Sequence, residues 1–156
     1  MSEELNKAIS FKFDDQNVTW LPFGKFKGLA YTIFDVDVEK RTADVMFRFE
    51  PNTKCFYHRH VAASSALVVD GEHHVFEVDE VTGVESHVIK PVGTFTYKSG
   101  GDVHIEGGGD QGVTVFMHME AETDLMYEVL EDDLSLKMAV SVHQFKETLD
   151  RIKSKG

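Results

Sequence analysis

Short runs in which apolar and polar side chains alternate occupy most of the chain between residues 18 and 119. The clearest run is at 42–49, where Ala43, Val45 and Phe47 would share one face of a strand. Similar β-rich runs, bounded by turn residues, lie at 29–38, 66–69, 74–78, 84–89, 93–97 and 113–120. Seven or more short strands with almost no helical periodicity between them predict an all-β fold, either a sandwich or a barrel.

The periodicity changes near the C-terminus. The apolar residues that recur there at roughly helical spacing are Val142, Phe145, Leu149 and Ile152. Ser141 precedes Gln144 by three residues, which is the sequence of a capping box. We therefore expect an amphipathic helix at about 142–154, preceded by a polar hairpin.

Turn signals divide the strands but no linker divides the chain. Asp70-Gly71 is a dipeptide typical of hairpin turns, and Thr82-Gly83 indicates a second turn. No internal repeat or low-complexity segment interrupts the pattern. We expect a single domain over residues 1–156, with a core at about 18–120 and a C-terminal hairpin and helix at about 121–155.

Composition narrows the classes of partner. The chain has 16 Lys and Arg against 27 Asp and Glu, a net charge of −11. This acidic excess argues against nucleic acid or an anionic membrane surface as the partner. The only cysteine, Cys55, cannot form an internal disulfide, and no run approaches the roughly 20 apolar residues of a transmembrane helix. We expect a cytoplasmic protein.

Eight histidines stand out in this acidic chain, and two of them are closely spaced. His58 and His60 lie two residues apart, so on a strand both imidazoles would point to the same face. Two neutral imidazoles that converge in this way form half of a transition-metal site. The pair is a weak signal by itself, because about 0.4 such pairs would arise by chance in a chain of this composition.

A second region strengthens the signal. After Gly93 comes a β-rich run, then the turn Ser99-Gly100-Gly101, then His104. The turn lets the chain reverse, so His104 would begin a strand beside the one that carries His58 and His60.

Together the two regions resemble the two conserved blocks of the cupin superfamily. The first block corresponds to His58-Arg59-His60, Ser64-Ser65 and Asp70-Gly71, and the second to Gly93, Ser99-Gly100-Gly101 and His104. The first glycine of the second block's turn is preceded by serine where the family has proline. The resemblance implies a single cupin-type antiparallel jelly-roll barrel, here with a short C-terminal helix, and one divalent metal near its centre.

The departure from the family pattern concerns a carboxylate. Most metal cupins supply a glutamate from the first block, where this chain has Ser65 or, by the other spacing, Ser64. Three neutral imidazoles would leave the full +2 charge of the metal uncompensated, which favours anionic, chelating substrates. Three-histidine cupin sites are similar to those of dioxygenases that cleave β-diketones and hydroxyacetophenones, including the small acetylacetone and 2,4'-dihydroxyacetophenone dioxygenases.

This resemblance implies an Fe(II)-dependent dioxygenase that acts on a small enolisable carbonyl compound. Its metal-binding and catalytic residues would be His58, His60 and His104. Zinc, nickel or manganese remain alternatives to iron, because three imidazoles suit all of them. The alternative functions are a non-redox zinc or nickel lyase or isomerase, and a metal-containing cupin that binds a small molecule without turnover.

Five further residues are candidates for contacts to the metal ligands or to substrate: Ser64, Ser65, Tyr97, Glu106 and His118. Glu106 follows His104 by two residues and would be either a replacement carboxylate or a rim residue before a glycine loop. Tyr97 alternates in phase with Phe95, which favours an inward position. His118 would either line the pocket or be an ordinary hydrogen-bonded histidine.

The remaining histidines have no partner at ligand spacing, and we expect them to be solvated: His73, His74, His87 and His143. Barrels of this size leave strand edges that can pair with a second copy. We therefore expect a homodimer, with the N-terminal strands and the hairpin at 124–136 as the candidate contacts.

Overall fold

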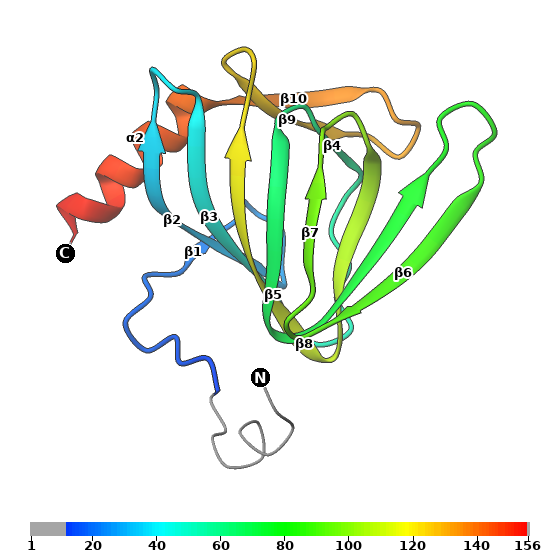
Figure 1. Ribbon diagram of the computed structural model, residues 1–156, viewed down its shortest axis with the longest axis horizontal. Coiled ribbons are helices and arrows are strands. Elements are labelled where there is room, and N and C mark those ends of the chain that lie inside the picture. The colour runs from blue at the N-terminus through cyan, green and yellow to red at the C-terminus, as the bar shows by residue number, and fades with distance from the viewer. Residues whose placement is uncertain (1–11, 156) are drawn as a thin grey trace.

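A computed structural model describes residues 12–155 as a curled antiparallel sheet with one helix beside it (Figure 1). The strands are β1 (Leu21–Pro22), β2 (Leu29–Asp37), β3 (Thr42–Phe49), β4 (His58–His60), β5 (Ala63–Val78), β6 (Glu85–Pro91), β7 (Phe95–Lys98), β8 (Val103–Glu120), β9 (Leu125–Leu130) and β10 (Leu136–Ser141). The helix is α2 (Val142–Ser154). The predicted all-β fold with a short C-terminal helix is confirmed.

Two long strands, β5 and β8, connect the halves of the sheet. One path of neighbouring strands runs β1-β2-β3-β8-β4-β9-β10, and β5 pairs with β6, β7 and β8. The N-terminal part of β5 pairs with β7 and the C-terminal part with β6. Because β5 and β8 each take part in both halves, the sheet curls around an interior that the strands face from several sides (Figure 1).

The hairpin predicted at Asp70-Gly71 is wrong, because β5 continues through this dipeptide. The register between β5 and β8 shifts there, on both sides of Asp70 and Gly71. Gly71 has φ +75° and Gly112 on β8 has φ +74°, a backbone conformation that favours glycine. A Cβ on Gly71 would lie 2.1 Å from the carbonyl oxygen of Gly112. The two glycines therefore let both strands bend together at a close contact, where a hairpin would have reversed the chain.

The helix closes one side of the core. The capping box is present, since the Ser141 hydroxyl accepts from the Gln144 N–H at 3.4 Å and Gln144 Oε1 accepts from the Ser141 N–H at 2.7 Å. Val142, Phe145 and Leu149 are buried against the sheet interior, as the helical spacing predicts. No helix among residues 12–155 is both long and apolar enough to cross a membrane.

The expected homodimer contacts lie in β1 and β2 and in the β9–β10 hairpin. Leu136 in that hairpin is 58% exposed and Phe34 on β2 is 46% exposed. The homodimer stays a prediction.

Candidate metal centre

Three of the predicted residues meet in the interior of the curled sheet. His58 lies directly opposite His104 in the antiparallel pairing of β4 with β8, and His60 follows two residues later on β4. The turn at Gly100-Gly101 holds the start of β8 beside β4, because the Gly101 N–H donates a hydrogen bond to the carbonyl oxygen of His60 at 2.7 Å. All three imidazoles are buried, with His104 the most exposed at 9%.

Glu106 is the fourth member of the cluster. One ligand atom from each of His58, His60, His104 and Glu106 can be chosen so that all lie within 4.8 Å of one another. Glu106 Oε2 lies 2.9 Å from His58 Nε2 and 3.6 Å from His104 Nε2. Three imidazoles and one carboxylate, gathered at this distance in a buried position, form a donor set that suits divalent transition metals.

Unpartnered nitrogens provide a test of whether these residues fit a metal. His60 Nδ1 and both ring nitrogens of His104 are buried and have no hydrogen-bond partner among the described residues. An unsatisfied buried polar atom costs about 1–3 kcal/mol, so such atoms are rare without a reason. Coordination of a metal would satisfy imidazole nitrogens that are otherwise left without a partner, and the residues therefore fit one.

The position of Glu106 corrects the expected charge of the site. Ser64 and Ser65 occupy the positions where most metal cupins have their glutamate, but here the carboxylate is that of Glu106 on β8, two residues after His104. Glu106 is only 8% exposed. It is therefore an interior residue and not a rim residue. A divalent ion held by three neutral imidazoles and this carboxylate would carry a net charge of +1, not the +2 of a site with histidines alone. The two-residue spacing was the sequence signal for this ligand.

The pKa values of the four residues of the cluster are shifted in different directions. Burial alone would raise the pKa of Glu106, but the surrounding imidazoles of His104, His58 and His73 hold that pKa well below its usual range. Burial alone would lower the pKa of His58, yet Cys55 and Glu106 raise it well above its ordinary value of 6.5. Burial and the neighbouring His58 lower the pKa of His60 to about 3, and the same causes lower that of His104. Without a metal, the proton between His58 and Glu106 therefore belongs to His58.

Metal binding should therefore release a proton. At pH 6.5 we expect about one proton released per metal ion, because His58 must lose its proton while His60 and His104 are already neutral. The affinity should rise about tenfold per pH unit until the pH reaches the raised pKa of His58. Calorimetric titration with Zn²⁺ in two buffers of different ionisation enthalpy measures the number of protons released per metal ion. A heat that does not depend on the buffer would contradict this proton assignment.

His73, which we expected to be solvated, is instead a buried partner of Glu106. It is 2% exposed, and its Nε2 lies 2.9 Å from Glu106 Oε1. The two residues are 33 positions apart. The continuous β5 places His73 opposite Gly108 on β8, two residues beyond Glu106. A hairpin at Asp70-Gly71 would have removed this contact, so the sequence analysis missed it. Glu106 is thus held from both sides, by His58 and by His73.

Removing His73 should weaken metal binding without removing a ligand. We expect His73→Phe to lower the affinity for Zn²⁺ about 10- to 100-fold, because Glu106 would lose the partner that fixes its Oε1. His73→Gln, which keeps an N–H donor, should recover part of the loss. Competition with a chromogenic chelator gives the affinities. The adjacent His74→Phe is the matched control, since His74 bonds to Glu72 and His87 instead, and equal losses in both variants would argue for a general structural effect.

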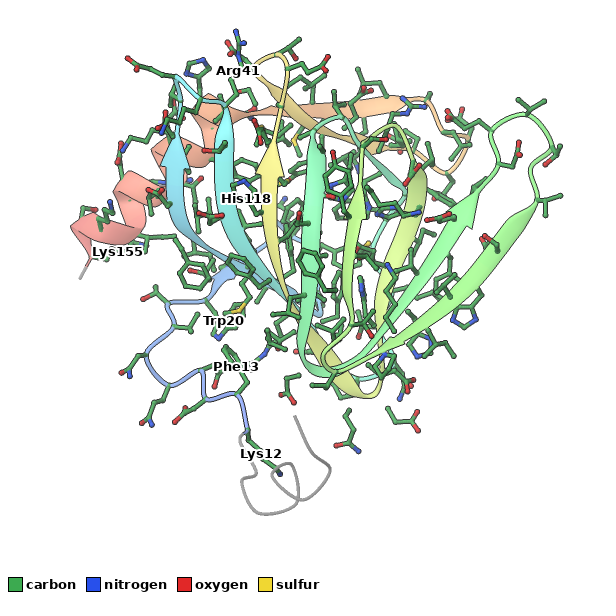
Figure 2. The ribbon with its side chains drawn as sticks, viewed as in Figure 1. Lys12, Phe13, Trp20, Arg41, His118 and Lys155 are labelled. Carbon is green, nitrogen blue, oxygen red and sulfur yellow. The ribbon has the colours of Figure 1, made fainter. Side chains whose placement is uncertain are left out.

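The other predicted site residues divide between the two faces of the sheet. Ser64 points inward and is 8% exposed. Ser65 pairs with both Tyr97 and His118, and these three lie on the outer face. Tyr97 is 65% exposed. The His118 side chain, labelled in Figure 2, is 43% exposed, and its Nδ1 lies 2.6 Å from Asp44 Oδ1. The expected inward position of Tyr97 is wrong, because the register of β7 against β5 turns Thr96 and Lys98 inward and Tyr97 outward. His118 matches the alternative of an ordinary hydrogen-bonded histidine.

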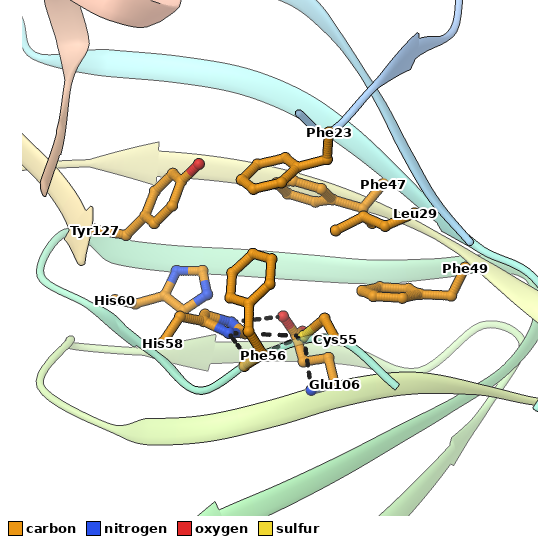
Figure 3. Close-up of a pocket in the computed structure, with 10 residues that line it drawn as sticks. All are labelled: Phe23, Leu29, Phe47, Phe49, Cys55, Phe56, His58, His60, Glu106 and Tyr127. Atoms are coloured by element: carbon orange, nitrogen blue, oxygen red, sulfur yellow. Dashed lines mark hydrogen bonds and ion pairs between the residues drawn. The ribbon is translucent and has the colours of Figure 1, made fainter. Parts of the chain in front are cut away.

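Two pockets meet the cluster from different directions. The first is apolar, and its lining residues are Phe23, Leu29, Phe47, Phe49, Cys55, Phe56, His58, His60, Glu106 and Tyr127 (Figure 3). In Figure 3 the rings of Phe23 and Phe47 lie across the pocket from the imidazoles of His58 and His60. The second pocket is polar and reaches His60, His104 and Glu106 from the side of β6 and β7. The cluster therefore borders an apolar pocket on one side and, on the other, a pocket that is lined mainly by polar and charged residues.

The sequence matches one family of known protein domains. A family model described as the ChrR cupin-like domain matches residues 10–122. No curated protein sequence matches the chain.

Solved structures share the fold. An RmlC-like cupin protein from Ralstonia eutropha is 14% identical with a TM-score of 0.69, covering 96% of this chain and 92% of its own. An acetylacetone dioxygenase from Acinetobacter johnsonii is 13% identical with a TM-score of 0.69, covering 92% and 91%. A variant of oxalate decarboxylase from Bacillus subtilis is 20% identical with a TM-score of 0.60, but only 32% of that longer chain is covered, against 78% of this one. At these identities the likeness concerns the fold.

Proposed function

We propose that this chain, which belongs to the ChrR cupin-like domain family by its match over residues 10–122, is a metal-dependent dioxygenase. The substrate would be a small enolisable carbonyl compound of the β-diketone or hydroxyacetophenone type. The observation that carries the proposal is the apolar, aromatic-lined pocket that ends on His58, His60 and Glu106. The fold shared with an acetylacetone dioxygenase supports the reaction class.

His58, His60, His104 and Glu106 would hold the metal, with Fe(II) as the proposed ion. A bound Fe(II) would supply the activation of O₂ and the positive charge that stabilises an enolate. In the overall reaction one C–C bond of a β-diketone breaks, and the two oxygen atoms of O₂ are distributed between a carboxylic acid and a 2-oxoaldehyde or diketone. No further oxidant or reductant is needed for this balance.

The side chains of the pocket supply binding and the exclusion of water. Phe23, Phe47 and Phe49 would contact the hydrocarbon part of the substrate and bury it. Tyr127 lines the same pocket, and burial raises the pKa of its phenol, which therefore stays protonated. Glu106 stays deprotonated because its pKa is held low, so it remains an acceptor toward His58 and His73.

The test is oxygen uptake by iron-loaded protein. The chain is loaded anaerobically with Fe(II), its iron content is measured, and acetylacetone and 2,4'-dihydroxyacetophenone are added in air-saturated buffer. We expect O₂ uptake matched by one carboxylic acid per O₂ from acetylacetone, and by two, 4-hydroxybenzoic and formic acid, from 2,4'-dihydroxyacetophenone. His118→Ala, whose side chain lies on the outer face, should retain the activity. Bound iron with no uptake across a panel of such carbonyl compounds would contradict the proposal.

A non-redox reaction is the second candidate, and Glu106 favours it. A carboxylate in addition to three imidazoles lowers the charge of the site and takes one of the positions that O₂ and a chelating substrate would need together. The oxalate decarboxylase of similar fold has Mn(II) centres. Turnover that persists without O₂, in protein loaded with Zn²⁺, Ni²⁺ or Mn²⁺, would favour a lyase or isomerase. Metal bound tightly without any turnover would favour a binding protein.

A further inference from the structure

A third pocket, which we call the outer pocket, lies between α2 and the curled sheet. Its lining residues come from both, among them Phe145 and Thr148 of α2 and Tyr31, Tyr127 and Met138 of the sheet. Met138 is exposed and Phe145 is buried, so the pocket leads inward from the surface. Its free volume is about 210 Å³, against about 30 Å³ for the apolar pocket at the metal centre. Most of the space for a bound molecule therefore lies in the outer pocket.

A wall of aromatic side chains separates the outer pocket from the apolar pocket. Phe23, Phe47 and Tyr127 line both pockets. Tyr127 connects them, because its ring centroid lies 6.4 Å from that of His60 and 5.8 Å from that of Phe145. The outer pocket therefore begins one aromatic ring away from a proposed metal ligand. Rotation of these side chains would join the two pockets into one.

Tyr127 also leaves a hydrogen-bond donor at this boundary. Its side chain is buried, yet its hydroxyl forms no hydrogen bond with any residue from 12 to 155. Burial and the nearby phenol of Tyr31 raise the pKa of Tyr127, so the hydroxyl keeps its proton. In Figure 3 this hydroxyl points toward Phe23 and away from the imidazole of His60. A buried phenol normally has a partner, so a molecule bound at the boundary should offer it an acceptor oxygen.

We infer that the outer pocket binds an aryl group of the substrate, so that the proposed enzyme acts on an aryl-substituted ketone or diketone in preference to acetylacetone. The inference rests on the proposed function, because it places the chelating oxygens of the substrate at the metal centre. The ring would pack against Phe145, and the hydroxyl of Tyr127 would donate to the carbonyl oxygen next to the ring. An aliphatic diketone has no group that fills this pocket.

Two matched ligands test the inference without turnover. Acetylacetone and 1-phenyl-1,3-butanedione have the same chelating group, and a phenyl group replaces one methyl in the second. Isothermal titration measures the affinity of each for the chain loaded with Zn²⁺, which is redox-silent. We expect the phenyl compound to bind the parent chain at least tenfold more tightly, because its ring leaves water for an aromatic-lined pocket.

A variant locates the ring within the molecule. Met138→Trp places a larger side chain at the mouth of the outer pocket and should reduce the tenfold preference to less than about threefold. The affinity for acetylacetone should change by less than about twofold, because this ligand does not need the outer pocket. Leu136→Trp is the matched control, since Leu136 is exposed on the same strand, β10, and does not line the pocket. It should retain the preference of the parent.

Three results would overturn the inference: equal affinity of the parent chain for the two ligands, an unchanged preference in Met138→Trp, and an equal loss of both ligands in that variant. The first comparison uses only the parent chain, and zinc content and thermal midpoint are measured for each variant. Tighter binding of the phenyl compound without O₂ uptake by the iron-loaded chain would contradict the dioxygenase proposal but support the aryl site. Equal binding of the two ligands with O₂ uptake would support the dioxygenase proposal and contradict the aryl site.

Discussion

The His104→Ala variant is expected to bind Zn²⁺ or Fe(II) more than about 100-fold more weakly than the parent chain, a larger loss than the replacement of a residue that only supports a ligand. His104 contributes an imidazole to the cluster from β8, while His58 and His60 come from β4. Its removal leaves two imidazoles and a carboxylate, and no other histidine among the described residues of the cluster can take its place. Metal content by mass spectrometry and competition with a chelator give the affinity.

The same variant should fold. Both ring nitrogens of His104 are buried without a partner, so in the metal-free chain the truncation removes two unsatisfied polar atoms as well as packing volume. We expect the thermal midpoint of the metal-free protein to change by less than about 5 °C, because these two effects oppose each other. His118→Ala is the matched control and should retain metal. An unfolded His104→Ala chain would show that the imidazole is needed for the fold as well.

Replacing Glu106 with glutamine is expected to have the second largest effect, and it should appear even without metal. The buried carboxylate holds the proton of His58 in place and accepts from His73, so the neutral amide leaves a buried ion pair broken. Breaking such a pair costs about 3–5 kcal/mol, which for a chain of this size lowers the thermal midpoint by roughly 6 °C or more. Metal affinity should fall as well, since the only carboxylate of the cluster is lost.

The pH dependence of the stability of Glu106→Gln distinguishes the loss of the buried ion pair from a general loss of packing. The low pKa of Glu106 stabilises the fold above the ordinary carboxyl pKa of 4.5, and this contribution is lost as the pH falls through the lower pKa of the folded state. The difference in stability between the parent and Glu106→Gln should therefore shrink in acid. Glu120→Gln, an exposed carboxylate at the end of β8, is the control and should match the parent at every pH. A difference between parent and Glu106→Gln that stays constant in acid would point to shape and not to charge.

The parts of the site that depend on local spacing could be predicted from the sequence. His58 and His60 share a face because of their two-residue interval on a strand, and the Gly100-Gly101 turn brings His104 beside them. Both features depend on a few neighbouring residues, so they can be predicted without knowing how the remaining strands pair. Glu106 follows from the same two-residue rule, and the sequence could offer it only as one of two readings because burial is a property of the whole fold.

The parts that depend on register could not be predicted. Tyr97 and His118 lie on the outer face because β7 and β8 pair with β5 in a register that the sequence does not specify, and a shift of one residue exchanges the faces. His73 reaches Glu106 only because β5 continues past Asp70-Gly71. That continuation depends on a glycine in another strand, Gly112, which a local turn signal cannot reveal.

Gly71 and Gly112 also restrict how this chain can change in evolution. The bend that they share fixes the offset between β5 and β8, and therefore which residues of the two strands lie opposite each other. This offset sets His73 opposite Gly108, from where its imidazole reaches Glu106. A single insertion within either strand would turn every following side chain to the other face and separate these partners. Changes in length should therefore collect in the turns at 79–84 and 131–135, where they leave the ligands in place.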